Sequence, residues 1–255
     1  MMDRDHRLGD ELILGRNPVS EALKAGARVK RVFVVRGLRG PRIESLVKEA
    51  RSRGIPVEEI DRSRLDLIAG RHASVKHQGI VATAAPRSYS DVEGILAYAE
   101  SRGEPPFVVA LSGIEDPMNL GAILRTAEAA GLHGAIIPGR RAAGLTPAVT
   151  RASAGAVEHL RVAMVTNITS TLRELKRKGL WIAGLDAGGQ CLWETDLRGP
   201  LAIVVGGEGK GLGRLVRETC DFIVGIPMKG RIESLNAGVA AALAIFEALR
   251  QRSDT

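Results

Sequence analysis

Aromatic side chains make up only 3% of the 255 residues, which leaves few surfaces on which single-stranded bases could stack. The two cysteines, Cys191 and Cys220, form no CxxC or metal-ligand pattern, so we expect reduced thiols, no metal site and a cytoplasmic protein. No run of about eighteen apolar residues is free of charge, which predicts no membrane span. The charged segment Met1–Asp10 lacks a signal-peptide core and is predicted to be disordered.

Positive charge, in contrast, is plentiful. The chain has a net charge of +7, and a composition of 45% hydrophobic and 25% charged residues that is ordinary for a globular protein. A basic balance favours a polyanionic partner, of which nucleic acid is the first candidate. The positive charge could instead serve only to keep the protein soluble, and charge by itself does not decide between the two explanations.

Apolar runs alternate with helical patterns, which predicts α/β architecture. A first module is expected over residues 11–86, followed by a linker over 87–105 with a short helix near Val92–Glu100. The strands predicted in the module are Val32–Val35, Pro56–Ile60 and Gly79–Ala84, and the helices are Pro18–Ala25, Arg42–Arg53 and Ser63–Ala69.

The second domain is expected over residues 106–255, where near-continuous apolar strands alternate with helices. This pattern predicts a mostly parallel sheet covered on both faces. The predicted strands are Phe107–Leu111, Gly134–Ile137, Leu160–Val165, Leu180–Leu185, Leu201–Val205 and Phe222–Ile226. The predicted helices are Leu120–Ala130, Pro147–Ala154, Ile168–Lys178, Leu212–Glu218 and Ser234–Arg250, and His133 is expected at the surface.

A first block with chemical potential, Gly113–Ala127, joins a strand to a helix. Asn119 is the expected N-cap of that helix. Arg125 lies in a largely apolar stretch, where a guanidinium needs acceptors or an anion. A surface arginine that extends past small alanines is the alternative.

The second block is the glycine-rich stretch Val204–Gly213 at the end of a strand, where backbone amides can approach a ligand. Its spacing is not G-x-G-x-x-G, and Gly211 stands after Lys210 where a P-loop needs Ser or Thr. Glu208 would suit a ligand with hydroxyl groups or would orient an arginine. A flexible turn is the alternative.

The third block, Ile226–Asn236, follows a strand and opens a long apolar helix. Ser234 is the expected N-cap, and Asn236 is expected as a buried amide in the first turn, where it needs polar partners. A merely structural capped helix is the alternative.

Taken together, the three blocks resemble the motifs of the SpoU family of RNA ribose methyltransferases. The matching residues are Asn119-x-Gly121-x-x-x-Arg125, then Gly206-Gly207-Glu208-Gly209-Lys210-Gly211-Leu212, then Ile226-Pro227-Met228 with Ser234-Leu235-Asn236. The first module is similar to the family's ribosomal-protein-like RNA-binding domain through Gly15–Leu23 and His77–Ala82. This arrangement most resembles the branch that acts on a guanosine of 23S rRNA.

The resemblance implies a Rossmann-like sheet with a deep trefoil knot, a homodimer, RNA as the partner and S-adenosylmethionine as the cofactor. It implies that the cofactor is held by Gly206, Gly207, Gly209, Ile226, Pro227, Met228, Ser234 and Leu235. It implies a catalytic set of Arg125, Asn119, Glu208, Ser234 and Asn236, with Arg125 acting on the ribose 2′-hydroxyl as base or as electrostatic stabiliser. The long helix after Asn236 would help to build the dimer interface.

Other functions stay open at this stage. A tRNA guanosine 2′-O-methyltransferase and a resistance-type rRNA methyltransferase share the three motifs. A non-catalytic RNA-binding assembly factor would also suit the basic charge and the first module. A nucleotide-binding oxidoreductase is disfavoured by the glycine spacing.

Overall fold

The computed structural model describes residues 11–24, 29–70, 77–85, 89–140, 142–207, 209, 211–232 and 234–253. They form two compact units, one ending at residue 88 and one beginning at Tyr89. Each unit has its own hydrophobic core. The predicted disorder of Met1–Asp10 lies outside the described residues.

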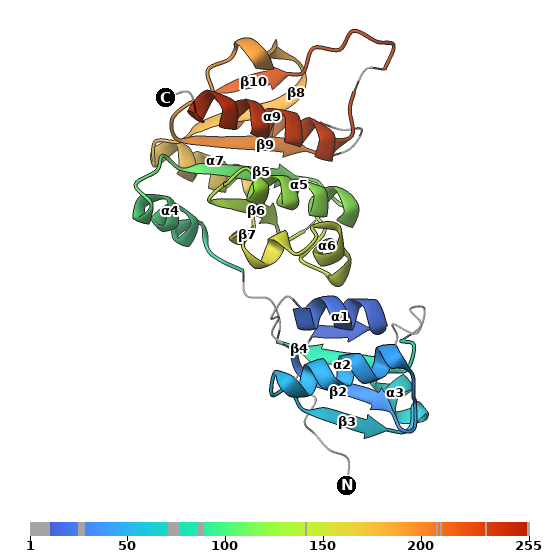
Figure 1. The fold of residues 1–255 in the computed structure, drawn as a ribbon. Coiled ribbons are helices and arrows are strands. Elements are labelled where there is room, and N and C mark those ends of the chain that lie inside the picture. The colour runs from blue at the N-terminus through green and yellow to red at the C-terminus, as the bar shows by residue number, and fades with distance from the viewer. Residues whose placement is uncertain are drawn as a thin grey trace. The chain divides into compact units, whose positions relative to one another are not determined.

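The first unit packs three helices against a four-stranded sheet with the strand order β1-β4-β2-β3 (Figure 1). Among the described strands of this sheet, β2 and β3 run parallel to each other, and the other two pairings are antiparallel. In chain order, the elements are β1 (Glu11–Leu14), α1 (Arg16–Lys24), β2 (Val29–Val35), α2 (Pro41–Ser52), β3 (Val57–Ile60), α3 (Arg62–Ala69) and β4 (Ile80–Ala84).

Strand β1 is the element of this unit that the sequence analysis missed. Its four residues are too few to show a period, and β1 exists because it pairs antiparallel with β4, where Glu11 faces Ala84. This partner lies far away in the sequence, so the local pattern carries little signal. The expected helices and the other strands of the unit are present, and no end is shifted by more than three residues.

The second unit contains a six-stranded, wholly parallel sheet with the order β10-β8-β9-β5-β6-β7 (Figure 1). Its strands are β5 (Phe107–Ser112), β6 (Gly134–Pro138), β7 (Val162–Val165), β8 (Trp181–Cys191), β9 (Leu201–Gly206) and β10 (Phe222–Gly225). Its helices are α4 (Val92–Ser101), α5 (Pro117–Ala129), α6 (Pro147–Ala152), α7 (Ile168–Arg177), α8 (Arg214–Thr219) and α9 (Ala237–Ser253), with the short 3-10 turns η2 (Ala156–Glu158) and η3 (Leu192–Glu194).

Helices cover both faces of this sheet, as the sequence predicts. On one face α5 and α9 bury Leu120, Leu124 and Ile245 against the strands. On the other face α4, α7 and α8 bury a second cluster that includes Ile95 and Leu172. Leu124 is fully buried, so its truncation to alanine would cost about 2–5 kcal/mol. Two apolar faces explain why the central strands show unbroken apolar runs.

Two elements differ from the expected organisation of this unit. Helix α4, expected within a linker, packs on the sheet through Val92 and Ile95, and Ser90 N donates to Val162 O at 2.9 Å. Strand β8 continues beyond the predicted end at Leu185, because Val224 and Gly225 of β10 pair with Gln190 and Cys191. The glycines near its end favour a turn locally, and pairing with β10 overrides them.

Candidate functional site

The first predicted block begins where β5 ends and α5 starts. Asp116, and not Asn119, caps this helix: its carboxylate accepts hydrogen bonds from Met118 N at 3.1 Å and Asn119 N at 3.3 Å. These bonds hold the pKa of the Asp116 carboxyl below its usual range, and the bond from Met118 N has the largest effect. Pro117 directly after Asp116 is the local signal for this start, since proline favours the first helical position.

Asn119 lies inside the first turn of α5 and is only 7% exposed. Its Oδ1 accepts a hydrogen bond of 2.8 Å from Asn236 Nδ2. This bond joins the first and third predicted blocks, and it gives the buried amide oxygen of Asn119 the partner that burial requires.

Asn236 is the N-cap of α9, which corrects the prediction for Ser234. Its Oδ1 accepts hydrogen bonds from Gly238 N at 2.9 Å and from Val239 N at 3.3 Å. The helix begins at Ala237, so Asn236 precedes the first turn. Asn236 is also exposed, whereas the sequence suggested a buried amide. Its side chain caps α9 with one amide atom and binds Asn119 with the other. These two contacts explain why a polar residue precedes so apolar a helix.

The glycine-rich block closes tightly on itself after β9. Gly211 N donates to Gly207 O at 3.0 Å, and a Cβ on Gly206 would lie 2.3 Å from the carbonyl carbon of Gly211. A Cβ on Gly207 would lie 2.3 Å from the carbonyl oxygen of Gly113, at the end of β5. Only glycine fits at these two positions, because the clashing atoms are backbone. The loop therefore packs on the strand that leads into the first block.

Among the described residues of this loop, Gly209 is exposed and has a φ of +72°. Glu208 lies outside the described residues, so its expected place beside Arg125 or a ligand stays a prediction. An exposed glycine backbone beside close-packed glycines is an arrangement in which a ligand can approach the main chain closely.

Between β10 and α9, the residues that the structure describes form no helix or strand. Ile226 is half-buried against the core, while Pro227 and Ser234 are exposed. Met228 is 39% exposed and Leu235 is 37% exposed. Apolar side chains at the carboxyl end of a parallel sheet, beside open backbone, are typical of ligand sites in α/β folds.

Arg125 lies on α5, with its side chain exposed. In the part of the chain that the structure describes, it has no hydrogen-bond or ion-pair partner. The sequence analysis expected acceptors or an anion for this guanidinium. A guanidinium that is exposed and has no partner among the described residues is available to an anionic group from outside the chain.

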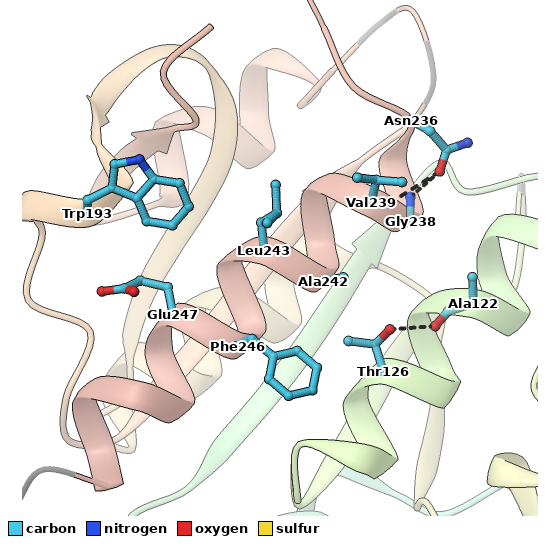
Figure 2. Close-up of a pocket in the computed structure, with 10 residues that line it drawn as sticks. All are labelled: Ala122, Thr126, Trp193, Asn236, Gly238, Val239, Ala242, Leu243, Phe246 and Glu247. Atoms are coloured by element: carbon cyan, nitrogen blue, oxygen red, sulfur yellow. Dashed lines mark hydrogen bonds between the residues drawn. The ribbon is translucent and has the colours of Figure 1, made fainter.

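An apolar groove lies next to these residues, between α5 and α9. Figure 2 shows Ala122 and Thr126 on α5, Leu243 and Phe246 on α9, and Trp193 from η3. Trp193 is 46% exposed and Phe246 is 48% exposed. Exposed large side chains gathered in one groove are unusual on a monomer and mark an interaction surface.

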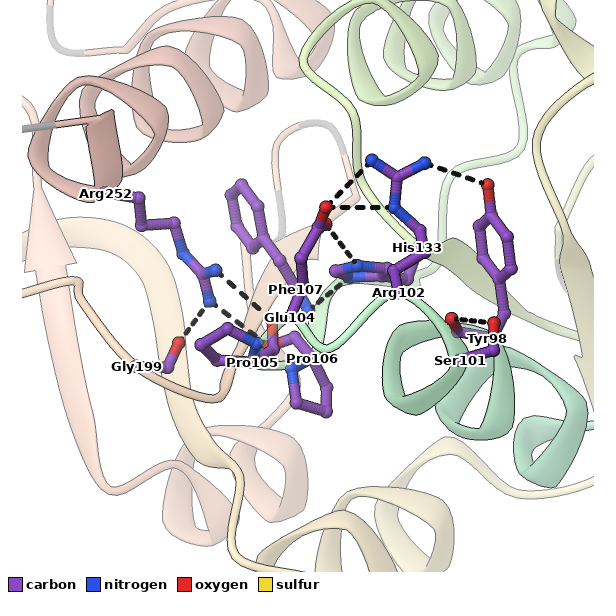
Figure 3. A network of polar contacts seen from close by, with 10 residues as sticks. All are labelled: Tyr98, Ser101, Arg102, Glu104, Pro105, Pro106, Phe107, His133, Gly199 and Arg252. Carbon is purple, nitrogen blue, oxygen red and sulfur yellow. Dashed lines mark hydrogen bonds and ion pairs between the residues drawn. The ribbon is translucent and has the colours of Figure 1, made fainter. Parts of the chain in front are cut away.

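A separate polar cluster lies at the amino end of β5, away from the three blocks (Figure 3). His133 is 3% exposed, so the expectation of a surface residue is wrong. Its Nδ1 accepts from Phe107 N at 2.9 Å, and its Nε2 lies 3.0 Å from Glu104 Oε2. Burial lowers the pKa of His133, and Glu104 opposes this effect. The sequence analysis placed His133 at the surface because histidine is polar. In the structure, its two ring nitrogens join the start of β5 to Glu104.

Arg252 closes the same cluster from the end of α9. Its guanidinium lies 4.4 Å from the centre of the Phe107 ring, and its Nη2 donates to Pro106 O at 3.2 Å and also to Gly199 O. Burial lowers the pKa of Arg252. These contacts fasten α9 to the amino end of the sheet, and they give this cluster a structural role.

The fold defines an α/β protein in which the three sequence blocks follow β5, β9 and β10, at the carboxyl edge of the parallel sheet. A model of the SpoU rRNA Methylase family matches residues 106–246, and a model for RNA 2′-O ribose methyltransferase substrate binding matches residues 12–90. The chain belongs to the SpoU rRNA methylase family, as the sequence motifs predict.

Similar proteins extend over almost the whole chain. A Bacillus subtilis (strain 168) protein assigned to the TrmH family of tRNA/rRNA methyltransferases is 41% identical over 245 residues, covering 95% of this chain and 96% of its own length. A Staphylococcus aureus (strain MSSA476) protein of the same description is 42% identical, with coverages of 96% and 98%.

Solved structures agree in fold. The SpoU methyltransferase AviRb from Streptomyces viridochromogenes, in complex with the cofactor AdoMet, has a TM-score of 0.72 and 27% identity, covering 99% of this chain and 95% of its own. An RNA 2′-O ribose methyltransferase has a TM-score of 0.67 and 29% identity, with coverages of 98% and 92%. The expected cofactor, S-adenosylmethionine (AdoMet), is thereby confirmed at the level of the family.

Two further observations concern other kinds of site. Within the described ranges, no helix is both long and apolar enough to cross a membrane. In that same part of the chain, no group of three or more His, Cys, Asp or Glu side chains could hold a metal ion.

Proposed function

We propose that this protein uses S-adenosylmethionine to methylate a ribose 2′-hydroxyl in RNA, and that its target is a guanosine of 23S rRNA in the cytoplasm. The observation that carries the proposal is the hydrogen bond from Asn236 to Asn119. This bond links the first and third motifs at the edge of the sheet where the glycine loop also emerges. This meeting of segments far apart in the sequence supports the proposal, because an active site of this family is built from all three motifs.

The glycine loop and the β10 exit fit such a cofactor. Gly206 and Gly207 have no room for a side chain, and Gly209 exposes its backbone. We infer that these glycines and the backbone of Ile226, Pro227, Met228 and Leu235 hold the cofactor. Bound there, the cofactor supplies the electrophilic methyl group. The half-exposed side chains of Met228 and Leu235 would cover its apolar parts and exclude water.

We assign to Arg125 the role of acting on the target ribose. A guanidinium is a poor base, so its role is to hold the RNA phosphate and stabilise the developing alkoxide. The exposed side chain has no partner in the described part of the chain to compete with RNA. Asn119 and Asn236 would fix the start of α5, the helix from which Arg125 projects. Ser234 and Glu208 would contact the target nucleotide or orient Arg125.

We also propose a homodimer whose interface includes the groove of Figure 2. Val239, Leu243 and Phe246 form a stripe on α9 at helical spacing, and all three are at least 37% exposed. A second copy of this chain is the occupant that the family resemblance implies. The deep trefoil knot, which the C-terminal part of the chain would form by threading through a loop, belongs to the same proposal.

The dimer is tested by Leu243→Arg, with Leu67→Arg as a matched control. Leu67 is also an exposed leucine on a helix, at 80%, but lies in the first unit. Analytical ultracentrifugation should find Leu243→Arg monomeric and Leu67→Arg dimeric. A wild-type monomer at micromolar concentration would contradict the proposed interface.

The function is tested by mapping 2′-O-methylation in RNA from cells with and without the protein, together with labelling by purified enzyme and radioactive S-adenosylmethionine. We expect one guanosine of 23S rRNA to lose its methyl group without the protein. Methylation of tRNA instead would support the tRNA alternative, because the names of the bacterial relatives cover both RNAs. RNA binding without methyl transfer would support the non-catalytic assembly factor.

A further inference from the structure

A bulge in β8 lies beside both of the predicted cofactor segments, although it is part of none of the three motifs. Strand β10 pairs with Ala183 and Gly184 of β8 and next with Gln190 and Cys191, so residues 185–189 leave the ladder with β10. The bulge contains Asp186, which the reaction proposed above does not use. Bulges in sheets often re-aim a side chain next to an active site.

The backbone of this bulge packs directly on β10. A Cβ on Gly189 would lie 2.6 Å from the carbonyl oxygen of Ile223, so only glycine fits there. A Cβ on Gly225 would lie 3.2 Å from the carbonyl oxygen of Asp186. The bulge thus contacts the last residues of the strand that leads to Ile226.

The side chain of Asp186 points the other way, to the glycine loop and α8. Its Oδ1 lies 3.0 Å from the place where a Cβ of Gly211 would stand, and Gly211 has a φ of +56°. Its Oδ2 lies 2.5 Å from Arg217 Nη1, and its Oδ1 also accepts from Ala187 N at 2.8 Å. The carboxylate is held at both oxygens, with its side chain 22% exposed.

Gly211 carries this support to the predicted cofactor contacts. Its N–H donates to Gly207 O at 3.0 Å. Its carbonyl carbon would lie 2.3 Å from a Cβ added to Gly206, so the two backbones are closely packed. A shift of Gly211 would therefore move the backbone of both glycines, because close-packed backbone has no flexible side chain to absorb a displacement.

We propose that Asp186 is a positioning residue for cofactor binding. Its carboxylate, paired with Arg217, supports Gly211 and so holds Gly206 and Gly207 in the conformation that accepts S-adenosylmethionine. It acts through the loop and has no contact with the reacting atoms. The inference rests on the proposed function only in assigning the cofactor to this loop.

The test uses the full-length protein and four variants. Asp186→Asn keeps the shape and removes the charge, Asp186→Ala removes the support, Arg217→Met keeps the stem of the arginine, and the fourth variant combines Asp186→Ala with Arg217→Met. The control is Glu218→Gln, which breaks an ion pair of 2.8 Å with Arg214 within α8 and leaves both partners of the Asp186–Arg217 pair in place. Calorimetric titration with S-adenosylmethionine, hydrogen exchange of residues 206–213 and thermal unfolding are measured for each.

We expect the Kd for S-adenosylmethionine to rise about tenfold in Asp186→Ala and Arg217→Met, as the loss of a charge-assisted contact predicts. The Kd of the double variant should be no higher than that of the single variant with the higher Kd, because both changes break the same Asp186–Arg217 interaction. Exchange over residues 206–213 should speed up in these variants and not in Glu218→Gln. The KM for the cofactor should rise while kcat stays close to that of wild type.

Unchanged cofactor affinity and unchanged exchange in Asp186→Ala would overturn the inference. Additive losses in the double variant would also overturn it, since Asp186 and Arg217 would then act separately. If Asp186→Ala does not fold, Asp186→Asn and Arg217→Met still decide the question. Wild-type protein that binds no S-adenosylmethionine would refute the proposed function instead, and the exchange comparison would still test the support of the loop.

Discussion

Asn236 Nδ2 donates a hydrogen bond of 2.8 Å to Asn119 Oδ1, although 117 residues separate the two asparagines in the sequence. The bond holds the first turn of α5 against the start of α9. Because the other amide atom of Asn236 caps α9, one side chain controls both where α9 begins and how it meets α5.

Replacing Asn236 should therefore affect stability and activity differently. In Asn236→Ala both the cap and the bond to Asn119 are lost, and we expect a loss of about 1–2 kcal/mol in the free energy of unfolding. In Asn236→Ser the cap survives, so stability should recover in part, while the bond to Asn119 is still missing. Urea unfolding and a methylation assay of both variants check this. Full activity in Asn236→Ser would contradict a role of the pair in the site.

The glycine loop predicts a sharp contrast between its first and last glycines, Gly206 and Gly213. Gly206→Ala places a Cβ 2.3 Å from the Gly211 backbone, whereas a Cβ on Gly213 meets nothing within 4 Å. We expect Gly206→Ala to lose binding of S-adenosylmethionine at least about tenfold, since a misplaced loop forfeits contacts worth over about 1.4 kcal/mol. Gly213→Ala should bind like wild type. Calorimetry decides, and tight binding by Gly206→Ala would mean that the cofactor does not depend on this loop.

Arg125→Ala should abolish methyl transfer while cofactor affinity stays nearly intact. The side chain is exposed and has no partner in the described ranges, so the free energy of unfolding should change by no more than about 0.5 kcal/mol. Arg173→Ala, which removes another exposed arginine from α7 on the other face of the sheet, is the control and should stay active. Loss of cofactor binding in Arg125→Ala would argue against the role assigned to it.

The buried His133 predicts a pH dependence of stability. Because burial lowers its pKa, the unfolded chain binds more protons than the folded one between the folded pKa and the unfolded value near 6.5. Stability should thus be full above that value and fall as the pH drops towards 5. Glu104 stays ionised over this range, since Arg102 lowers its pKa.

The variant His133→Gln removes this titration and should flatten the dependence. Urea unfolding of wild type and variant between pH 7.5 and pH 5 gives the two slopes. Equal slopes would show that His133 contributes nothing to the acid sensitivity, whatever the absolute stabilities are. The remaining histidines are common to both proteins and cancel in the comparison.

Most elements of the parallel sheet could be predicted from the sequence, because strands buried on both faces show continuous apolar runs. Helix starts were harder to predict. Asp116 and Asn236 cap α5 and α9, whereas the sequence analysis predicted Asn119 and Ser234 for these positions. Several residues near a helix start can accept the free amides, and the choice between them depends on which side chain has another partner to satisfy.

The sequence by itself determined the family, the order of the motifs and the two-faced sheet, since these depend on residue types at fixed spacings along the chain. Only the tertiary structure decided that Asn236 binds Asn119, that His133 is buried beside Glu104, and that Asp186 supports Gly211. Each of these contacts joins residues from different elements. Their partners are chosen by strand order and register, which local sequence patterns do not record.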